Sequence, residues 1–239
     1  MPELDNRWDQ FPLLEWKDPE HTQEVIETVR DVTEAAVEDA ELGLLYELAR
    51  GLHHDRPETQ GYVIELGSYK GGSTSAMALG VRDSGTKWKP VIAVDSYGRP
   101  HPDLQPGDVP NVVDGMKHDE NYVRARETYW KLGLAYDYVC QVVTRTHDIF
   151  WELWSNPIRM IFIDSGHLYN RTCSEIGSTL AHIVEDGWMV FHDYYNDEWG
   201  EGVIPAVNRL IDEDTKWQKV VYRAGQSFVP VHLKTKHSW

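Results

Sequence analysis

Short apolar runs alternate with helical stripes of apolar residues along most of the chain, and this pattern predicts strands that are each followed by a helix. The first five runs are continuous, which is typical of parallel strands buried on both faces. The predicted strands are Tyr62–Leu66, Val91–Val94, Tyr138–Val143, Met160–Ile163 and Trp188–Phe191. The predicted helices are His21–Thr33, Ala36–Leu52, Gly72–Val81, Asp119–Leu132, a short one from Asp148, Leu168–Glu185 and the stripe from Val203 to Ile211.

The end of the chain shows a different pattern. Two further apolar runs, Lys219–Tyr222 and Phe228–Leu233, flank a tight turn at Ala224–Gln226. Because so short a connection joins antiparallel neighbours, these runs predict a hairpin. We therefore expect an α/β fold, with a mostly parallel seven-stranded sheet, helices on both faces and an antiparallel C-terminal hairpin.

The length of the chain suits one domain, which we expect to span residues 1–239. Its N-terminal arm and helices, residues 1–55, begin with an aperiodic stretch that carries apolar anchors such as Trp16. This arm either docks on its own domain or covers the active site or a subunit partner. Residues 97–132 form an insertion whose first part is rich in Pro, Gly and Asp. Loops of this length in compact domains are usually functional or disordered, so we predict a lid over the site.

The formal net charge of −16 disfavours a nucleic-acid partner, because binding to phosphates needs a basic surface. The same charge disfavours an anionic membrane surface. No apolar run approaches the length of a membrane span, and the first residues are acidic and polar rather than signal-like. Cys140 and Cys173 are the only cysteines, and we expect buried thiols in a reducing compartment. These features predict a cytoplasmic protein with no nucleic-acid and no membrane partner.

Polar residues gather where the predicted strands end. A glycine-rich turn, GSYKGG at residues 67–72, follows the first strand and leads into a helix. Such a unit brings a ligand onto backbone N–H groups at a helix N-terminus. The other strand ends carry Asp95, then Thr146, His147 and Asp148, then Asp164 and His167, and last His192 and Asp193. Because open α/β sheets bind ligands at the carboxyl ends of their strands, we predict a ligand site along this edge.

This set of residues resembles the class I S-adenosylmethionine (SAM) dependent methyltransferases, from roughly Leu42 to the C-terminus. Their motif E-x-G-x-x-x-G-x-S is matched by Glu65, Gly67, Gly71 and Ser73. The acids after the second, fourth and fifth strands are similar to those of metal-dependent small-molecule O-methyltransferases, both the catechol type and the natural-product sugar and macrolide type. The resemblance implies a Rossmann-like sheet and methyl transfer from SAM to a hydroxyl of a small molecule, such as a natural product or sugar. A dinucleotide-binding dehydrogenase is disfavoured, because its G-x-G-x-x-G motif is not matched.

The resemblance also implies which residues bind the cofactor. Ser73 and the N–H groups of the turn suit the amino-acid carboxylate of SAM, and Glu65 either takes up the ammonium or organises the turn. Asp95 suits the two ribose hydroxyls, since a carboxylate accepts two donors. Thr146 and His147 match the positions that contact adenine in the family. The full expected set is Glu65, Gly67, Ser68, Gly71, Gly72, Ser73, Asp95, Thr146, His147 and Asp164.

On the acceptor side, the catechol-type enzymes hold Mg²⁺ with acids after strands four and five, and this ion lowers the pKa of the acceptor oxygen. Asp164 and Asp193 match two of these ligands, and His192 replaces the Asp or Asn that usually lies beside the second acid. Histidine suits Mn²⁺, Fe²⁺ or Zn²⁺ better than Mg²⁺. Three possibilities therefore remain open. The site binds magnesium, it binds another divalent metal through Asp164, His192 and Asp193, or it binds no metal.

His167 lies where the family carries a catalytic lysine. The ordinary pKa of histidine is near neutrality, so we predict His167 as the catalytic base, beside Asp164. We expect aromatic residues to line the acceptor, namely Trp130, Tyr194, Tyr195 and Trp199.

Two alternatives remain open. An iron-dependent oxygenase or hydroxylase on the same fold would need two histidines and one carboxylate, which His167, His192 and Asp164 or Asp193 supply. A SAM-binding protein without catalysis is the other alternative. The resemblance further implies a homo-oligomer.

Overall fold

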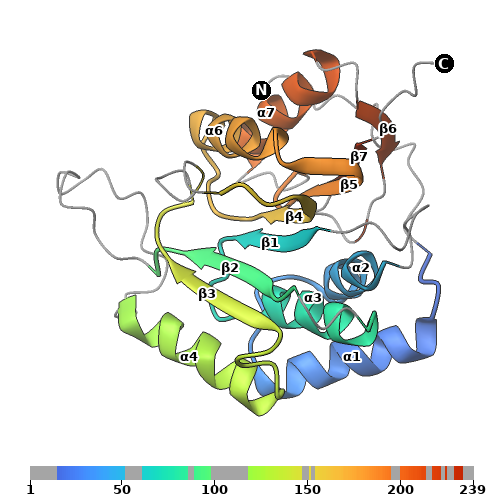
Figure 1. Ribbon diagram of the computed structural model, residues 1–239, viewed down its shortest axis with the longest axis vertical. Coiled ribbons are helices and arrows are strands. Elements are labelled where there is room, and N and C mark those ends of the chain that lie inside the picture. Colours follow the sequence, from blue (N-terminus) through green and yellow to red (C-terminus); the bar gives the residue numbers. More distant parts are fainter. Residues whose placement is uncertain are drawn as a thin grey trace.

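The structure, a computed structural model of the chain (Figure 1), describes residues 15–51, 61–85, 89–97, 118–146, 151, 154–194, 200–213, 217–221, 224 and 229–233. Its centre is a seven-stranded sheet in the order β3-β2-β1-β4-β5-β7-β6. Strands β1 to β5 are parallel, whereas β7 is antiparallel to both β5 and β6. The predicted sheet and its antiparallel C-terminal hairpin are confirmed. The strands are β1 (Tyr62–Leu66), β2 (Val91–Asp95), β3 (Val139–Val143), β4 (Ile158–Ile163), β5 (Ile183–Phe191), β6 (Trp217–Val221) and β7 (Val229–Leu233).

Helices cover both faces of this sheet (Figure 1). On one face lie α1 (Pro19–Val32), α2 (Asp39–Arg50), α3 (Gly72–Asp83) and α4 (His118–Lys131), and on the other α6 (Tyr169–Leu180) and α7 (Gly200–Glu213). Successive strand residues point to opposite faces. Val63 and Phe162 therefore join the core under α1 to α4, while Ile64 and Ile161 join the core under α6 and α7. This double burial explains why the strands are apolar at every position.

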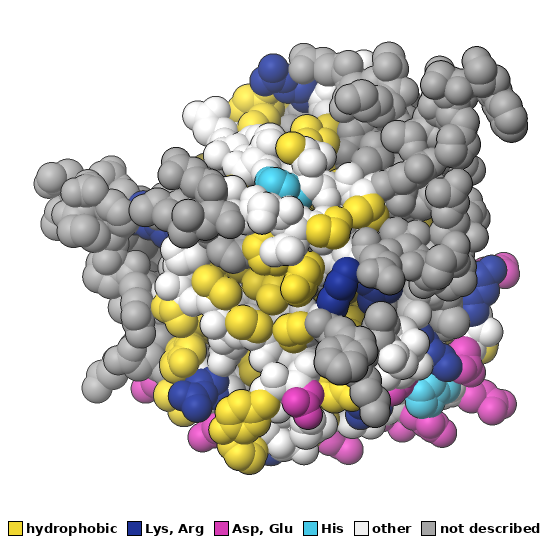
Figure 2. All heavy atoms as spheres, in the orientation of Figure 1, with side chains coloured by type: hydrophobic (Ala, Val, Ile, Leu, Met, Phe, Trp, Pro, Cys, Tyr) yellow, Lys and Arg dark blue, Asp and Glu magenta, His cyan; other side chains and the backbone are white. Residues whose placement is uncertain are grey.

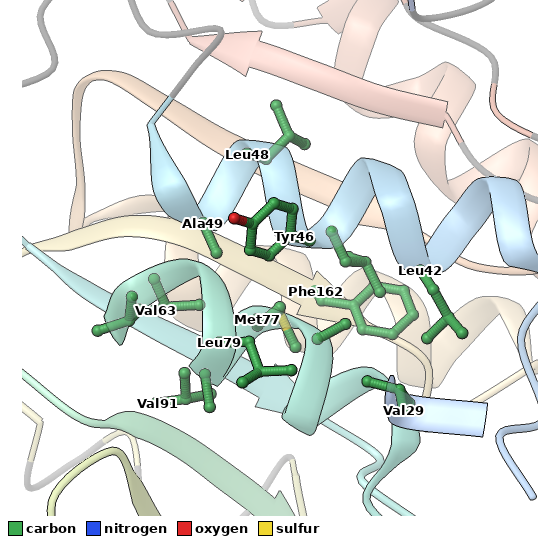
Figure 3. Packing of buried hydrophobic residues seen from close by; sticks show 14 of the residues in the cluster. Val29, Leu42, Tyr46, Leu48, Ala49, Val63, Met77, Leu79, Val91 and Phe162 are labelled. Atoms are coloured by element: carbon green, nitrogen blue, oxygen red, sulfur yellow. The ribbon is translucent and has the colours of Figure 1, made fainter. Parts of the chain in front are cut away.

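The first of these cores holds the N-terminal helices together. Figure 3 shows side chains from α1, α2, α3 and the sheet gathered in it, including Val29, Leu42 and Met77, which are fully buried. Asp83, at the end of α3, accepts a hydrogen bond from the Tyr46 hydroxyl of α2 at 3.0 Å and lies 3.2 Å from the His21 Nε2 of α1. The three helices are thus tied by apolar packing and by one shared carboxylate.

Two predicted boundaries are wrong, and both have local causes. We expected a helix to Glu185, but α6 ends at Leu180 and β5 begins at Ile183. Ile183 pairs with Ile158 of β4, so sheet pairing outweighs the helical spacing of its apolar side chain. Helix α2 begins at Asp39 rather than Ala36, because Glu38 forms a capping box with the third residue of the helix.

The N-terminal arm and the insertion are described only in part. Trp16 lies directly against α2, since an added Cβ on Gly43 would be 2.7 Å from its ring. The insertion's helix α4 packs on the core with Ala125 and Tyr129 buried, so it belongs to the body of the domain. Residues 1–14 and 98–117 lie outside the described residues. The lid and the domain limits therefore stay predictions.

The cysteines differ from expectation. Cys140 is exposed and Cys173 is partly buried, so the prediction of two buried thiols is wrong. Cys140 lies on β3, the edge strand of the sheet, which explains why this position reaches solvent.

The acidity of the chain is visible on its surface. Asp and Glu side chains gather along the lower edge of the view in Figure 2, over α1 and α4. None of the helices that the structure describes is long and apolar enough to cross a membrane.

The strand order reverses between β1 and β4, because the chain moves outward from β1 to β3 and then returns to β4 on the other side. In open α/β sheets the carboxyl ends of the strands at such a reversal form the ligand-binding crevice. The backbone is tightest at this point. Gly67, directly after β1, has φ +97°, and an added Cβ would lie 2.2 Å from the backbone oxygen of Asp164 after β4.

We therefore predict that Gly67→Ala lowers the free energy of unfolding by at least about 2 kcal/mol, through left-handed strain and the clash with backbone. Urea unfolding of the purified variant measures this. Gly177→Ala on α6 is the matched control, since no described atom lies within 4 Å of its added Cβ. The control should gain up to about 1 kcal/mol from helix propensity. Equal stability of Gly67→Ala and wild type would contradict the prediction.

Candidate active site

The glycine turn is held from below by Glu65, the buried acid near the end of β1. Glu65 accepts hydrogen bonds from the hydroxyls of Ser73 and Thr74, the second and third residues of α3. Burial raises the pKa of Glu65 to about 8, although the two hydroxyls lower it in part. Of the two roles that the sequence left open, the structure shows Glu65 organising the turn. The Ser73 hydroxyl is thus hydrogen-bonded to Glu65.

Asp95, at the end of β2, fixes the loops on either side of it. One carboxylate oxygen accepts the backbone N–H of Tyr69 at 2.8 Å, and the other accepts the N–H of Tyr97 at 2.6 Å. Burial raises the pKa of Asp95, and these two N–H groups oppose that rise. Each oxygen retains a further lone pair, so contact with ribose hydroxyls is still open to Asp95 and stays a prediction.

Tyr97 joins the turn to β3. Its hydroxyl is 2.8 Å from the Ser68 Oγ of the turn and accepts a hydrogen bond from the Gln141 amide at 2.8 Å. Its ring meets Tyr122 of α4 edge to face, with centroids 5.3 Å apart. Burial raises the pKa of the Tyr97 phenol well above its ordinary value. Ser68, a predicted cofactor residue, is therefore buried in a chain of hydroxyl and amide groups.

A small open cavity lies beside the turn. The turn and the start of α3 form one wall, and the link between α1 and α2 forms another through Glu34, Ala36 and Val37. Asp164 completes the lining from the end of β4. The link is held close to the turn, since an added Cβ on Gly72 would lie 2.4 Å from that of Ala35. The cavity thus joins Gly67, Ser68, Gly72, Ser73 and Asp164 of the predicted cofactor set.

Next to this cavity, the structure brings together two acids and two histidines. The His167 Nε2 lies 2.9 Å from an Asp193 oxygen, and the His192 Nδ1 lies 2.8 Å from the same oxygen. The His192 Nδ1 is also 3.2 Å from Asp164. All four predicted residues of the acceptor side, which came from separate strand ends, therefore lie within one cluster.

The charges in this cluster support one another. Burial alone lowers the pKa of His192, but the carboxylates of Asp164 and Asp193 outweigh it and raise that pKa to about 11. Burial alone also lowers the pKa of His167, but Asp193 outweighs this effect and raises that pKa. Burial alone raises the pKa of Asp193, but the two histidines outweigh this effect and hold that pKa well below its usual range. The Asp193 side chain contacts both rings. Its backbone has φ +60°, a sparsely populated conformation for a residue other than glycine.

The same cluster can be considered as a metal site. One ligand atom each from Asp164, His167 and Asp193 lies within 4.8 Å of the others. Two carboxylates and an imidazole suit a divalent transition metal. His192, the predicted third ligand, lies close enough to both acids to take that place instead of His167. The donor set fits a divalent ion with either histidine, whereas the methyltransferase resemblance had implied the set with His192 and only the iron-dependent alternative had included His167.

Glu41 is a carboxylate of the site that the sequence did not reveal. It lies on α2, is 1% exposed, and its Oε2 is 3.9 Å from the His192 Nε2. The same oxygen accepts the backbone N–H of Glu38 at 2.6 Å. Its spacing from Glu38 is the signature of a capping box. This local role accounts for Glu41 in the sequence, so its contact with the distant His192 was not expected.

The region predicted to contact adenine holds a second unforeseen acid. Thr146 donates a hydrogen bond to Glu175, a fully buried residue of α6, and Ser165 donates another to the same carboxylate. Burial raises the pKa of Glu175, which these hydroxyls oppose. His147 lies outside the described residues, so its contact with adenine stays a prediction. Glu175 lies beside the apolar stripe of its helix rather than on it, so the sequence pattern did not indicate its burial.

The aromatic residues are placed differently from expectation. Trp130 is 57% exposed on the last turn of α4. A short connection leads from there to the start of β3, so Trp130 lies at the opposite edge of the sheet from the site and its prediction is wrong. Tyr194 is buried, with its hydroxyl 2.7 Å from Asn208 of α7. Tyr195 and Trp199 lie outside the described residues.

A glycine turn, a cavity at the strand reversal and an acid after β2 define a nucleotide-type binding site of the doubly wound class. A family model described as a methyltransferase domain matches residues 64–194, more than half of the chain. The chain belongs to this methyltransferase-domain family. The matched segment runs from β1 to Tyr194, just past the acid–histidine cluster.

Other proteins share part of this sequence or its fold. Uncharacterized protein R132 of Acanthamoeba polyphaga mimivirus is 25% identical over 152 residues, which span 62% of this chain and 58% of that protein. Among solved structures, the O-methyltransferase NovP has a TM-score of 0.63 at 15% identity and covers 90% of this chain and 88% of its own. The methyltransferase PaMTH1 of Podospora anserina, bound to S-adenosylhomocysteine (SAH), has a TM-score of 0.60 at 15% identity with the same coverage. At such identities these structures show the shared fold.

The raised pKa of Glu65 generates a prediction about pH. A carboxyl that is neutral in the fold up to about pH 8, but ionised in the unfolded chain above about pH 4.5, makes stability fall as pH rises between these values. The slope for one group is at most about 1.4 kcal/mol per pH unit. Glu65→Gln removes this group, so the stability of wild type relative to Glu65→Gln should fall from pH 5.5 to 7.5.

Urea unfolding at several pH values measures this difference. Glu127→Gln, at an exposed position of α4, is the control and should keep the slope of wild type. Parallel pH curves for wild type and Glu65→Gln would show that the buried carboxyl is ionised throughout.

Proposed function

We propose that this protein is a SAM-dependent O-methyltransferase that acts on a hydroxyl of a small molecule, such as a natural product or a sugar. One observation carries the proposal: Asp164 lines the cavity at the glycine turn and also belongs to the acid–histidine cluster. A methyl donor held in this cavity therefore ends beside groups that orient and deprotonate an acceptor.

Several features support SAM as the cofactor. The turn and the helix start line the cavity, and the acid after β2 accepts a backbone N–H of that turn. These features suit an amino acid joined to a nucleoside. Helix α3 has no side-chain cap at its N-terminus, so its first N–H groups are suited to a carboxylate. NovP is described as an O-methyltransferase and PaMTH1 as bound to SAH, and both share the fold.

Methyl transfer to oxygen is an in-line displacement. The acceptor oxygen forms a bond to the methyl carbon, the bond from that carbon to sulfur breaks, and the hydroxyl proton leaves for a base. His167 is that base. Its Nε2 lies 2.9 Å from Asp193, and a neutral ring that donates this N–H has its basic lone pair on Nδ1. Asp193 thus orients His167 and stabilises the imidazolium that forms.

A divalent metal held by Asp164 and Asp193 with His192 would bind the acceptor oxygen and lower its pKa. In this proposal His167 stays outside this set, as the base. The positions of the two histidines around one Asp193 oxygen are compatible with this division of roles.

The acceptor is a small hydroxylated molecule in this proposal. The acidic surface over α1 and α4 disfavours a polyanionic partner such as nucleic acid (Figure 2). A homo-oligomer and a cytoplasmic location remain predictions of the sequence.

The iron-dependent oxygenase keeps one supporting observation, since both histidines and both acids lie within one cluster. Stoichiometric iron in the purified protein, with oxygen uptake and no methyl transfer, would favour it. SAH binding without methyl transfer to any acceptor would favour the non-catalytic alternative.

The test of the proposal is transfer of labelled methyl from SAM to a panel of catechols, phenols and nucleotide sugars. We expect transfer by wild type and a loss of at least about 10²-fold in turnover for His167→Ala, because a positioned base contributes that much. His21→Ala on α1 is the control and should keep the wild-type rate. SAH affinity should be unchanged in both variants. A near-normal rate for His167→Ala would refute the base.

The metal role has its own test. After dialysis against EDTA, turnover should fall and return on addition of Mn²⁺, since the donor set suits a transition metal. Mass spectrometry of bound metal should show about one ion in wild type and a large loss in Asp164→Asn. Turnover that is unchanged in EDTA would remove the metal from the mechanism.

A further inference from the structure

Lys70 lies on the glycine turn, and its side chain has no role in the proposed methyl transfer. Its side chain is 9% exposed, and it lines the same cavity as Ser73 and Asp164. Among the described residues of that lining, Lys70 is the one with a positive charge. A lysine is rarely so buried unless its charge has a use, because desolvation of an ammonium group is costly.

The partner of Lys70 is weakly held. The Lys70 Nζ lies 3.1 Å from a Glu34 oxygen, and Glu34 is 80% exposed. Burial alone lowers the pKa of Lys70, but Glu34 and Tyr69 outweigh it and raise that pKa, so Lys70 is charged at neutral pH. An ion pair with so exposed a carboxylate contributes little stability, because water replaces the lysine easily. Glu34 can therefore give up Lys70 to a ligand at low cost.

The donor that the sequence had suggested for a ligand carboxylate is already engaged. The Ser73 hydroxyl is hydrogen-bonded to the buried Glu65. The amino-acid end of SAM carries one ammonium and one carboxylate. Asp164 and Glu34 supply negative charge in the cavity, and Lys70 supplies the positive charge.

We propose that Lys70 binds the carboxylate at the amino-acid end of SAM and SAH, and that Glu34 releases Lys70 when the cofactor enters. This inference rests on the proposed function, since it assigns a further residue to the proposed cofactor site. Lys70 then distinguishes cofactors with the amino-acid end from nucleosides without it.

The experiment compares two ligands by isothermal titration of the full-length protein. SAH has the amino-acid end, whereas 5′-methylthioadenosine has the same nucleoside and thioether without it. Lys70→Met should weaken SAH binding about 10- to 100-fold, as expected for loss of a charged hydrogen bond, and leave methylthioadenosine binding unchanged. Lys70→Arg should retain most of the SAH affinity. Equal losses for both ligands, or no loss for SAH, would overturn the assignment.

Two further variants separate direct binding from indirect effects. In Lys70→Met the unpaired Glu34 could repel the carboxylate, so Lys70→Met/Glu34→Gln removes both charges. Continued weak SAH binding by the double variant supports direct contact, and recovery to the wild-type affinity overturns it. Lys89→Met, at the start of β2, is the matched control and should bind SAH like wild type.

The result also distinguishes the two proposals. Wild type that binds neither SAH nor methylthioadenosine overturns the proposed function together with the role of Lys70. Wild type that binds SAH, with Lys70→Met equally tight, overturns the role of Lys70 alone. Thermal unfolding of each variant checks that it is folded.

Discussion

The burial of one carboxyl group, that of Glu65, sets the geometry on which the rest of the site depends. Its two oxygens accept the hydroxyls of Ser73 and Thr74, so the end of β1 and the start of α3 are joined by side chains as well as by the turn. With both ends fixed, the turn must pass beneath Asp164 with Gly67 in a left-handed conformation. The cavity lies beside this turn, which forms one of its walls.

On the acceptor side, opposite charges in the acid–histidine cluster hold the side chains in place. One oxygen of Asp193 serves both His167 and His192, and Asp164 supports His192 from the other side. Glu41 adds a carboxylate near the second nitrogen of that ring. A change in the charge of any member therefore alters its neighbours, which is the behaviour expected of coupled groups in a place where protons move.

The sequence predicts well those features that depend on local pattern. The strand Tyr62–Leu66 was predicted with its observed limits because its apolar run is short and the turn after it is rich in glycine. The strand ends that carry Asp95, Asp164, His167, His192 and Asp193 were also found, since parallel topology brings them to one edge. Contacts between distant segments were not predictable, as with Glu41 and His192 or Ile183 and Ile158. The choice of Ser73 as a carboxylate donor did not foresee its bond to Glu65.

The strand order has a consequence for how the protein is made. During synthesis the glycine turn leaves the ribosome with β1, whereas Asp164 follows β4, which pairs with β1 only after β2 and β3 have been added on the other side. A nascent chain that ends at β3 has the turn but lacks one wall of the cavity. The full lining of that cavity thus exists only once Asp164 has been made, about two thirds of the way along the chain, and binding of a ligand there stabilises both halves of the sheet together.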